Sequence, residues 1–163
     1  MELISSETGW AEPTVLEGPA IPTAVIRHEA VTMGELRDLF DAAYPAVALA
    51  AGAQSNPPAG PALSCYEGDL TERFNVEIGF PLAAALESPQ GAVIASELPG
   101  GRVGVLSHVG PYDELPQAWE RLLAWVAAES RTPGPRFGEI YVTEPGPQTD
   151  PATLRTDLFV ELG

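Results

Sequence analysis

Short segments rich in apolar and β-branched residues, each bounded by glycine, proline or other turn formers, predict the strands of this chain. They are residues 23–31, 62–68, 73–82, 137–142 and 155–162. Residues 94–98 and 102–109 predict either a strand pair or one long bent strand, since Pro99-Gly100-Gly101 can form a turn or a bulge. Residues 2–22 carry a short apolar run among turn formers, which predicts an added arm or edge strand.

Two helices are predicted from apolar residues at helical spacing. Thr32 followed by Glu35 is the pattern of a capping box, so the first helix is expected to start at Met33. Its apolar stripe is Leu36, Phe40, Tyr44 or Ala43, and Val47. Pro45 should kink or split this helix. The second helix is expected from Pro111 to about Arg131, with the stripe Leu115, Trp119, Leu122, Leu123 and Val126.

The two halves of the chain repeat the order strand, helix, strand, strand. Val25–His28 echoes Val105–His108, and the following Glu35-Leu36 echoes Glu114-Leu115. We therefore expect an α+β fold of duplicated βαββ units with pseudo-twofold symmetry, a mainly antiparallel sheet and two helices flanking a central ligand groove. The expected organisation is one domain over residues 1–163: an arm at 1–22, a first unit at 23–90 and a second unit at 91–163.

The stretch from Gly134 to Pro145 holds the candidate chemistry. In a strand, Phe137, Glu139 and Tyr141 share one face. If that face is covered, a carboxylate lies between two aromatic rings, where it is costly unless something pairs with it.

Composition narrows the possible partners. The 163 residues carry a formal net charge of −15, and every basic residue is arginine. Such a chain should repel nucleic acid and anionic membranes and attract cations. Cys65 is the only cysteine, which fits a reducing compartment. No signal peptide is recognisable and the longest apolar run, residues 42–53, is too short to span a bilayer, so we expect a cytoplasmic protein.

Several motifs together resemble a known family. They are His108-Val-Gly-Pro-Tyr112 followed by Leu115 and Trp119, then Gly134-Pro135 leading to Glu139-Ile140-Tyr141, then Thr156-Asp157-Leu158. This pattern, clearest over residues 102–163, is similar to the GyrI-like small-molecule-binding domain, the effector-binding module of multidrug-responsive transcription regulators. The resemblance implies a duplicated βαββ fold and promiscuous binding of lipophilic, cationic aromatic compounds, with Glu139 touching the ligand. Residues 1–22 are too short for a helix-turn-helix, so a stand-alone copy of the module is expected.

Candidate site residues follow from the face of Glu139 and from the repeat. In the second half Tyr141, Trp119, Tyr112 and Phe137 are the aromatic candidates, each of which could also be ordinary core. The opposite wall would come from first-half aromatics, namely Phe40, Tyr44, Tyr66 and Phe80. The repeat pattern gives Cys65 the place that Glu139 takes in the second half. Glu77 and Asp157 also match, and either flank the groove or face solvent.

His28 and His108 match across the repeat too, but two histidines and one cysteine without ligand spacing are poor evidence for a metal. We expect no metal and no cofactor.

Three functions remain open. The first is capture of lipophilic cations without chemistry. The second is a hydrolase that detoxifies electrophilic natural products, with Glu139 as general base and Tyr141 as proton donor; no Gly-x-Ser-x-Gly, P-loop or Cys-x-x-Cys motif supports a known enzyme class. The third is a protein-interaction or inhibitor module, because a family namesake inhibits a topoisomerase.

Overall fold

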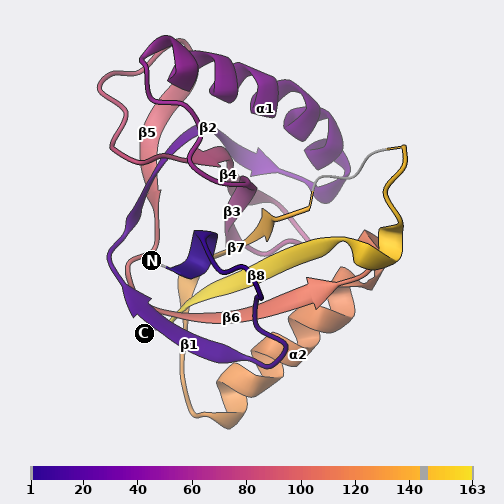
Figure 1. Ribbon diagram of the computed structural model, residues 1–163. Helices are drawn as coiled ribbons and strands as arrows, with labels where there is room; N and C mark the ends of the chain where they lie inside the picture. Colours follow the sequence, from indigo (N-terminus) through magenta and orange to yellow (C-terminus); the bar gives the residue numbers. More distant parts are fainter. Residues whose placement is uncertain (1, 144–146, 163) are drawn as a thin grey trace. The chain divides into compact units, whose positions relative to one another are not determined.

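The computed structural model describes residues 2–143 and 147–162. The chain divides into two compact units: a first unit, Ala20–Leu98, and a second unit, Met1–Pro19 together with Pro99–Gly163. Each unit contains four antiparallel strands and one long helix, which confirms the expected α+β class (Figure 1). The two units join in sequence between residues 98 and 99.

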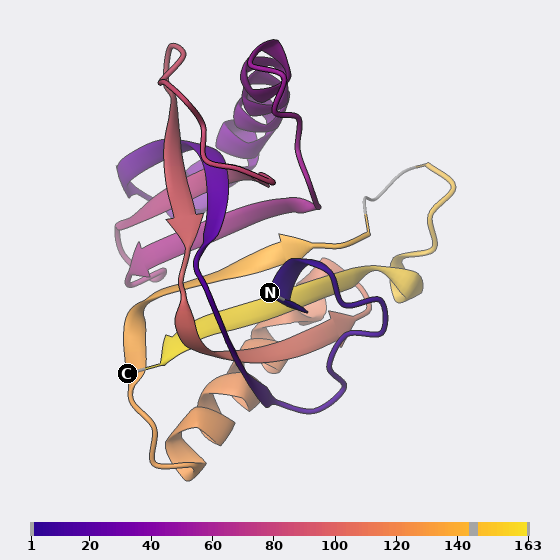
Figure 2. The same ribbon diagram turned by 60° about the vertical axis from the view of Figure 1, so that its left-hand side comes forward.

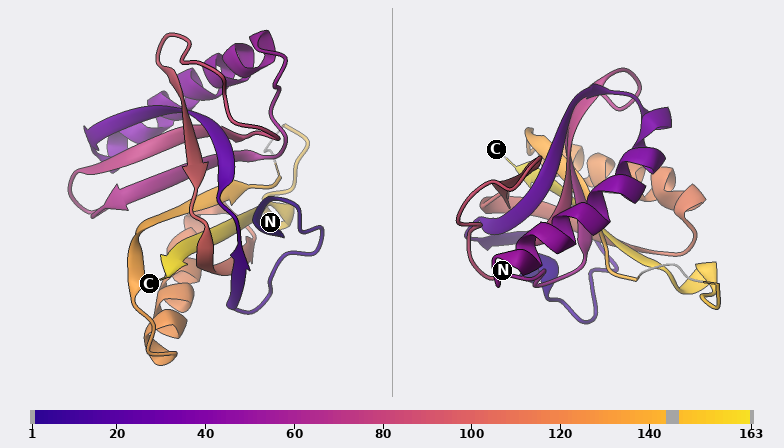
Figure 3. Two further views of the ribbon diagram at one scale, coloured as in Figure 1. Left: turned by 90° about the vertical axis from the view of Figure 1, so that its left-hand side faces the viewer. Right: turned by 90° about the horizontal axis from the view of Figure 1, so that it is seen from above.

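The first unit is built from the strands β2 (Ile21–Val31), β3 (Ala62–Gly68), β4 (Phe74–Pro81) and β5 (Val93–Leu98). They lie in the order β3-β4-β2-β5, each antiparallel to its neighbour. The helix α1 (Leu36–Ala53) follows β2 and covers one face of these strands (Figure 3). Residues 94–98 are thus an edge strand of the first unit, separate from the strand that follows Gly100.

The predicted capping box lies at the start of the first helix. The Thr32 amide and hydroxyl both donate to Glu35 Oε1, at 3.0 Å each. The backbone hydrogen bond, followed by the hydroxyl, holds the pKa of Glu35 below its usual value. The capped turn is a 3-10 turn, Met33–Glu35, and the α-helix proper begins at Leu36.

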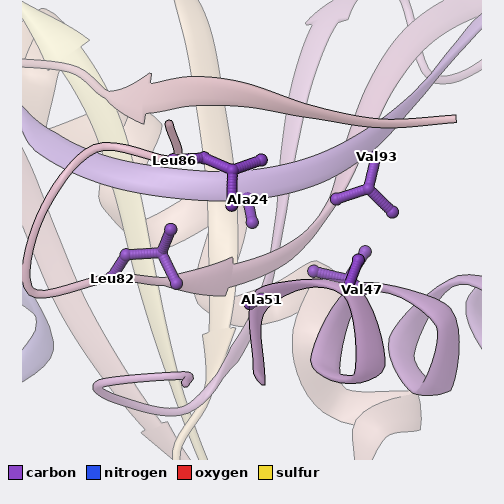
Figure 4. Close-up of a cluster of buried hydrophobic side chains, with 7 residues drawn as sticks. Ala24, Val47, Ala51, Leu82, Leu86 and Val93 are labelled. Carbon is purple, nitrogen blue, oxygen red and sulfur yellow. The ribbon is translucent and has the colours of Figure 1, made fainter. Parts of the chain in front are cut away.

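Pro45 does not split α1 into two helices, because α1 runs unbroken through it. The proline lies on the exposed side. The helix is held on both sides of it by the buried residues Ala43, Val47, Ala50 and Ala51. Val47 and Ala51 pack on Ala24, Leu82, Leu86 and Val93 in the core of the first unit (Figure 4). Apolar burial on both sides of Pro45 outweighs one missing helical hydrogen bond.

The second unit contains β1 (Thr14–Gly18), β6 (Gly101–Val109), β7 (Pro133–Tyr141) and β8 (Arg155–Leu162), in the order β1-β6-β8-β7. The helix α2 (Leu115–Ala128) packs on one face of these strands (Figure 2). The core between this helix and the strands consists of the buried side chains of Leu106, Leu122, Val126, Leu158, Val160 and Leu162. Leu123, predicted in this stripe, is 46% exposed, because it lies one residue past the buried Leu122.

The N-terminal arm lies against the strand face opposite α2. Arg155 on β8 donates to the carbonyls of Ser6 and Glu7, at 3.0 Å each. Its guanidinium also forms a bidentate ion pair with the Asp157 carboxylate. Ser107 Oγ donates to Asp157 Oδ1 (2.6 Å) and accepts from the Trp10 amide (2.8 Å). The arm then continues into β1, which pairs with β6 as an edge strand.

The strand registers confirm the internal repeat. In the first unit Ile26 and His28 on β2 face Ile78 and Val76 on β4. In the second unit Leu106 and His108 on β6 face Leu158 and Thr156 on β8. One constant difference in residue number therefore aligns β2 with β6 and β4 with β8. Among the helices of the described residues, none is both long enough and apolar enough to cross a membrane.

Candidate functional site

Glu139 lies on the strand face that α2 covers. On β7, Phe137, Glu139 and Tyr141 stand opposite Val160, Leu158 and Thr156 of β8. Val160 and Leu158 belong to the core beneath α2, so the three β7 side chains share that face. The sequence alternation predicted this correctly. Glu139 is partly exposed, and is less buried than the sequence suggested.

Both oxygens of the Glu139 carboxylate accept a hydrogen bond from a neighbouring aromatic residue. The Trp119 indole Nε1–H on α2 donates to Oε2 at 2.8 Å. The Tyr141 hydroxyl, two residues along the same strand, donates to Oε1 at 2.8 Å. Hydrogen bonds to an ionised acceptor are each worth about 1.5–3 kcal/mol. The two donors therefore fix the position of the carboxylate between helix and strand.

Further aromatic rings surround this pair. Phe137 packs edge-on against Trp119, with ring centroids 5.7 Å apart. Tyr112, in the 3-10 turn Tyr112–Glu114 before α2, packs edge-on against Tyr141 at 6.1 Å. The four second-half aromatics predicted from sequence are thus brought together with Glu139 within one unit.

The charge of Glu139 is not neutralised by the surrounding structure. Over residues 2–143 and 147–162, no arginine or histidine forms an ion pair with its carboxylate. Trp119 and Tyr141 are neutral donors, which orient a carboxylate without cancelling its charge. The arrangement is a fixed negative charge among aromatic rings.

The first-half candidates form a second aromatic cluster in their own unit. Tyr44 on α1 packs against Phe40 and against Phe80 of β4, each at 5.6 Å. Its hydroxyl donates to the Leu63 carbonyl at 3.0 Å. Tyr66 is 4% exposed and packs edge-on against buried Phe74, as a core residue does. The predicted groove between the two halves stays a prediction.

The predicted equivalence of Cys65 and Glu139 is wrong. Ser64 faces Ile78, as Glu139 faces Leu158, whereas Cys65 faces Glu77 on the other side of the strands. The same register makes Tyr66 the counterpart of Tyr141, a match that the sequence comparison missed. The predicted match is displaced by one residue along this strand, and a displacement of one residue moves every side chain to the opposite face.

Asp157 and Glu77 are structural groups and do not face solvent. Asp157 is 1% exposed and is paired with Arg155 and Ser107. Glu77 accepts from Arg27 (3.1 Å) and from Ser96 Oγ (2.6 Å) on the first-unit face opposite α1. Burial alone would lower the pKa of Arg27, but Glu77, Glu29 and Glu67 together outweigh it through hydrogen bonds and charge, so the pKa is raised.

The histidines take no part in a metal site within the described ranges, where no group of three or more His, Cys, Asp and Glu residues could hold an ion. His108 Nε2 lies 3.0 Å from the Pro111 carbonyl, to which it donates when protonated at that nitrogen. This contact joins the end of β6 to the turn that starts α2.

Comparison with models of known protein families shows which family this chain belongs to. The model of the GyrI-like small-molecule-binding domain matches residues 11–162. The chain belongs to the GyrI-like family. The family expected from the sequence motifs is therefore confirmed, and the match extends the resemblance from residues 102–163 to nearly the whole chain. A comparison with curated protein sequences found no significant match.

Solved structures of the same fold are similar to this GyrI-like domain. The EcmrR C-terminal domain has a TM-score of 0.73 at 18% identity and covers 93% of this chain and 97% of that one. SAV2435 bound to tetraphenylphosphonium has a TM-score of 0.66 at 12% identity, covering 93% and 94%. A hydrolase from Listeria innocua has a TM-score of 0.64 at 12% identity, covering 96% and 94%. At these identities the likeness concerns the fold.

The match to EcmrR in its complex with DNA covers 57% of that longer chain. The GyrI-like domain described here thus corresponds to part of EcmrR.

Proposed function

We propose that this GyrI-like domain binds lipophilic, cationic aromatic compounds at Glu139. The observation that carries the proposal is the fixed carboxylate with two neutral aromatic donors and no basic partner among the described residues. SAV2435, which has the same fold, is a protein described as bound to such a cation, tetraphenylphosphonium. The net charge of −15 also favours cationic ligands over nucleic acid.

The chemistry of the site suits a delocalised cation better than an ammonium ion. A lipophilic cation is weakly hydrated, so leaving water costs it little. Coulombic attraction to Glu139 and cation–π contacts of about 0.5–2 kcal/mol per ring supply the gain. Neither interaction is strongly directional, so one site can accept compounds of different shape.

Replacement of Glu139 tests the electrostatic role. In Glu139→Gln, the amide oxygen still accepts from Trp119 and the charge is lost. We expect tetraphenylphosphonium to bind about 10- to 100-fold more weakly, which corresponds to about 1.4–2.8 kcal/mol, by isothermal titration calorimetry. Tetraphenylborate has nearly the same shape and the opposite charge, so its binding should strengthen in the same variant.

The matched control is Glu120→Gln, which removes the same charge from an exposed position next to Trp119. Its affinities for both ions should stay within about two-fold of the parent, since a solvent-screened charge contributes little. If Glu139→Gln and Glu120→Gln weaken tetraphenylphosphonium equally, the effect is one of net charge and the Glu139 site is wrong.

A hydrolase is the second candidate, favoured by the 2.8 Å hydrogen bond between Tyr141 and Glu139. A carboxylate can accept further hydrogen bonds beyond these two, so Glu139 can still hold a water while Tyr141 supplies a proton. We expect such an enzyme to convert an epoxide or strained lactone at substoichiometric protein, with Tyr141→Phe slowing product formation about 100-fold or more. Mass spectra that show only unchanged compound across a panel of electrophiles would leave binding as the function.

A further inference from the structure

We infer that the Thr156 hydroxyl is a second polar anchor of the candidate site, which forms a hydrogen bond to an oxygen- or nitrogen-bearing substituent of the bound aromatic cation. This inference rests on the proposed function and narrows its ligand class. Tetraphenylphosphonium satisfies Glu139 alone, whereas the preferred ligand also carries a hydroxyl, carbonyl or amine on one ring.

The first observation is that the hydroxyl has no partner. Thr156 on β8 is fully buried, and its Oγ1 makes no hydrogen bond within the part of the chain that the structure describes. A buried hydroxyl without a partner destabilises the folded state, and nearly all buried polar side chains in proteins avoid this. Such a group needs a reason that the fold of this domain does not supply.

The internal repeat shows that the fold does not need a hydroxyl there. By register, the first-unit counterpart of Thr156 is Val76, since Val76 faces His28 as Thr156 faces His108. Val76 is also fully buried. Valine and threonine have nearly the same shape, so an apolar residue fits this position of the strand. The second unit therefore carries a hydroxyl at a position where the first unit has an apolar side chain.

The position of Thr156 connects it to the site. Tyr141 of β7 and His108 of β6 flank it directly in the strand register, and all three side chains lie on the α2 face. Side chains directly opposite in antiparallel strands have Cβ atoms about 4.5–5.5 Å apart. The Tyr141 hydroxyl in turn donates to Glu139. Thr156 is therefore next to the residue that holds the carboxylate, away from the indole of Trp119.

Tyr112 lies at the surface beside Tyr141, the β7 neighbour of Thr156. Tyr112 is 38% exposed and packs edge-on against Tyr141 from a single 3-10 turn. The inference requires these rings to shift when a ligand binds at Glu139, so that the ligand reaches the buried Thr156 hydroxyl. A hydroxyl both donates and accepts, so it can pair with a phenol, a ketone or an aniline.

The test compares phosphonium ions that differ in one substituent. Triphenylphosphonium ions with an ortho-, meta- or para-hydroxyphenyl ring are titrated beside the matching tolyl ions, in which a methyl group replaces the hydroxyl. We expect at least one hydroxyphenyl isomer to bind the parent about three- to ten-fold more tightly than its tolyl match, as one neutral hydrogen bond allows. Thr156→Val should abolish that preference and Thr156→Ser should keep it.

The outcomes separate this inference from the proposed function. Binding of tetraphenylphosphonium that depends on Glu139, with no hydroxyl preference in any isomer, would overturn the second anchor alone. A preference that survives in Thr156→Val would do the same. If no phosphonium ion binds the parent, both proposals are overturned.

Thermal unfolding without ligand gives an independent readout. Thr156→Val removes a hydroxyl that the free protein does not pair, so its melting temperature should rise by about 2–4 °C. A lower melting temperature would mean that the hydroxyl has a partner inside the folded protein, and would contradict its role as a free anchor.

Discussion

Replacing Gly79 by alanine should destabilise the protein by about 4 kcal/mol or more. A Cβ at this position of β4 would overlap the Ala24 carbonyl oxygen of β2 and lie 2.9 Å from both the Ala24 carbonyl carbon and Val25 Cα. These atoms belong to the backbone of a paired strand and cannot rotate away. The two strands would have to separate where Ala24 anchors the first-unit core, a disturbance in the range of severe core mutations. Urea denaturation followed by circular dichroism measures the loss.

Gly52→Ala is the matched control, because nothing lies within 4 Å of a Cβ added there. Gly52 is an exposed residue of α1, where alanine is the better helix former. Its free energy of unfolding should be unchanged or raised by up to about 1 kcal/mol. If Gly79→Ala is as mild as Gly52→Ala, the close approach of β2 and β4 at this position is wrong.

Arg155→Met should cost about 3–5 kcal/mol of folding free energy. The Arg155 and Asp157 side chains are 13% and 2% exposed, and their charges pair at 2.7 Å. Removal of the guanidinium leaves a buried carboxylate without its cation, which is the costly way to break such a pair. The arm also loses its hydrogen bonds at Ser6 and Glu7. Faster hydrogen exchange over residues 5–12 should accompany the loss.

Arg102→Met makes the same replacement in a surface pair of the second unit. Arg102 and Glu17 are 58% and 64% exposed, so this pair should contribute at most about 1 kcal/mol. Equal losses in Arg155→Met and Arg102→Met would contradict the buried role of Arg155. The double variant Arg155→Met/Asp157→Leu should recover part of the loss, because the uncompensated charge is gone.

Much of the candidate site could be predicted from local sequence. The alternation of Phe137, Glu139 and Tyr141 fixes their common face, and the helical spacing of Trp119 directs it towards the same strands. Both are short-range patterns that the backbone geometry imposes. The hydrogen bond from Trp119 to Glu139 could not be predicted, since it depends on how far α2 lies from β7.

The predictions that proved wrong concern residues whose environment is set by contacts between segments far apart in the sequence. Glu77 and Asp157 look like ordinary surface acids in sequence, and only the strand register brings Arg27 and Arg155 beside them. Cys65 was matched to Glu139 because a one-residue displacement is invisible in a weak repeat. Pro45 looked like a helix breaker, because its cost is local while the burial of Val47 and Ala51 that offsets it is tertiary.

If a cation binds at Glu139 as we propose, the hydrogen bond from Trp119 to Glu139 makes the indole an optical reporter of that binding. Indole emission responds to charge near the ring, and Nε1 of this indole is 2.8 Å from the carboxylate that a cation would approach. The two other tryptophans, Trp10 and Trp125, can be replaced by phenylalanine to leave a single emitter. Under the proposed function, that variant would be a fluorescent sensor whose signal originates at the indole beside Glu139, with no dye attached.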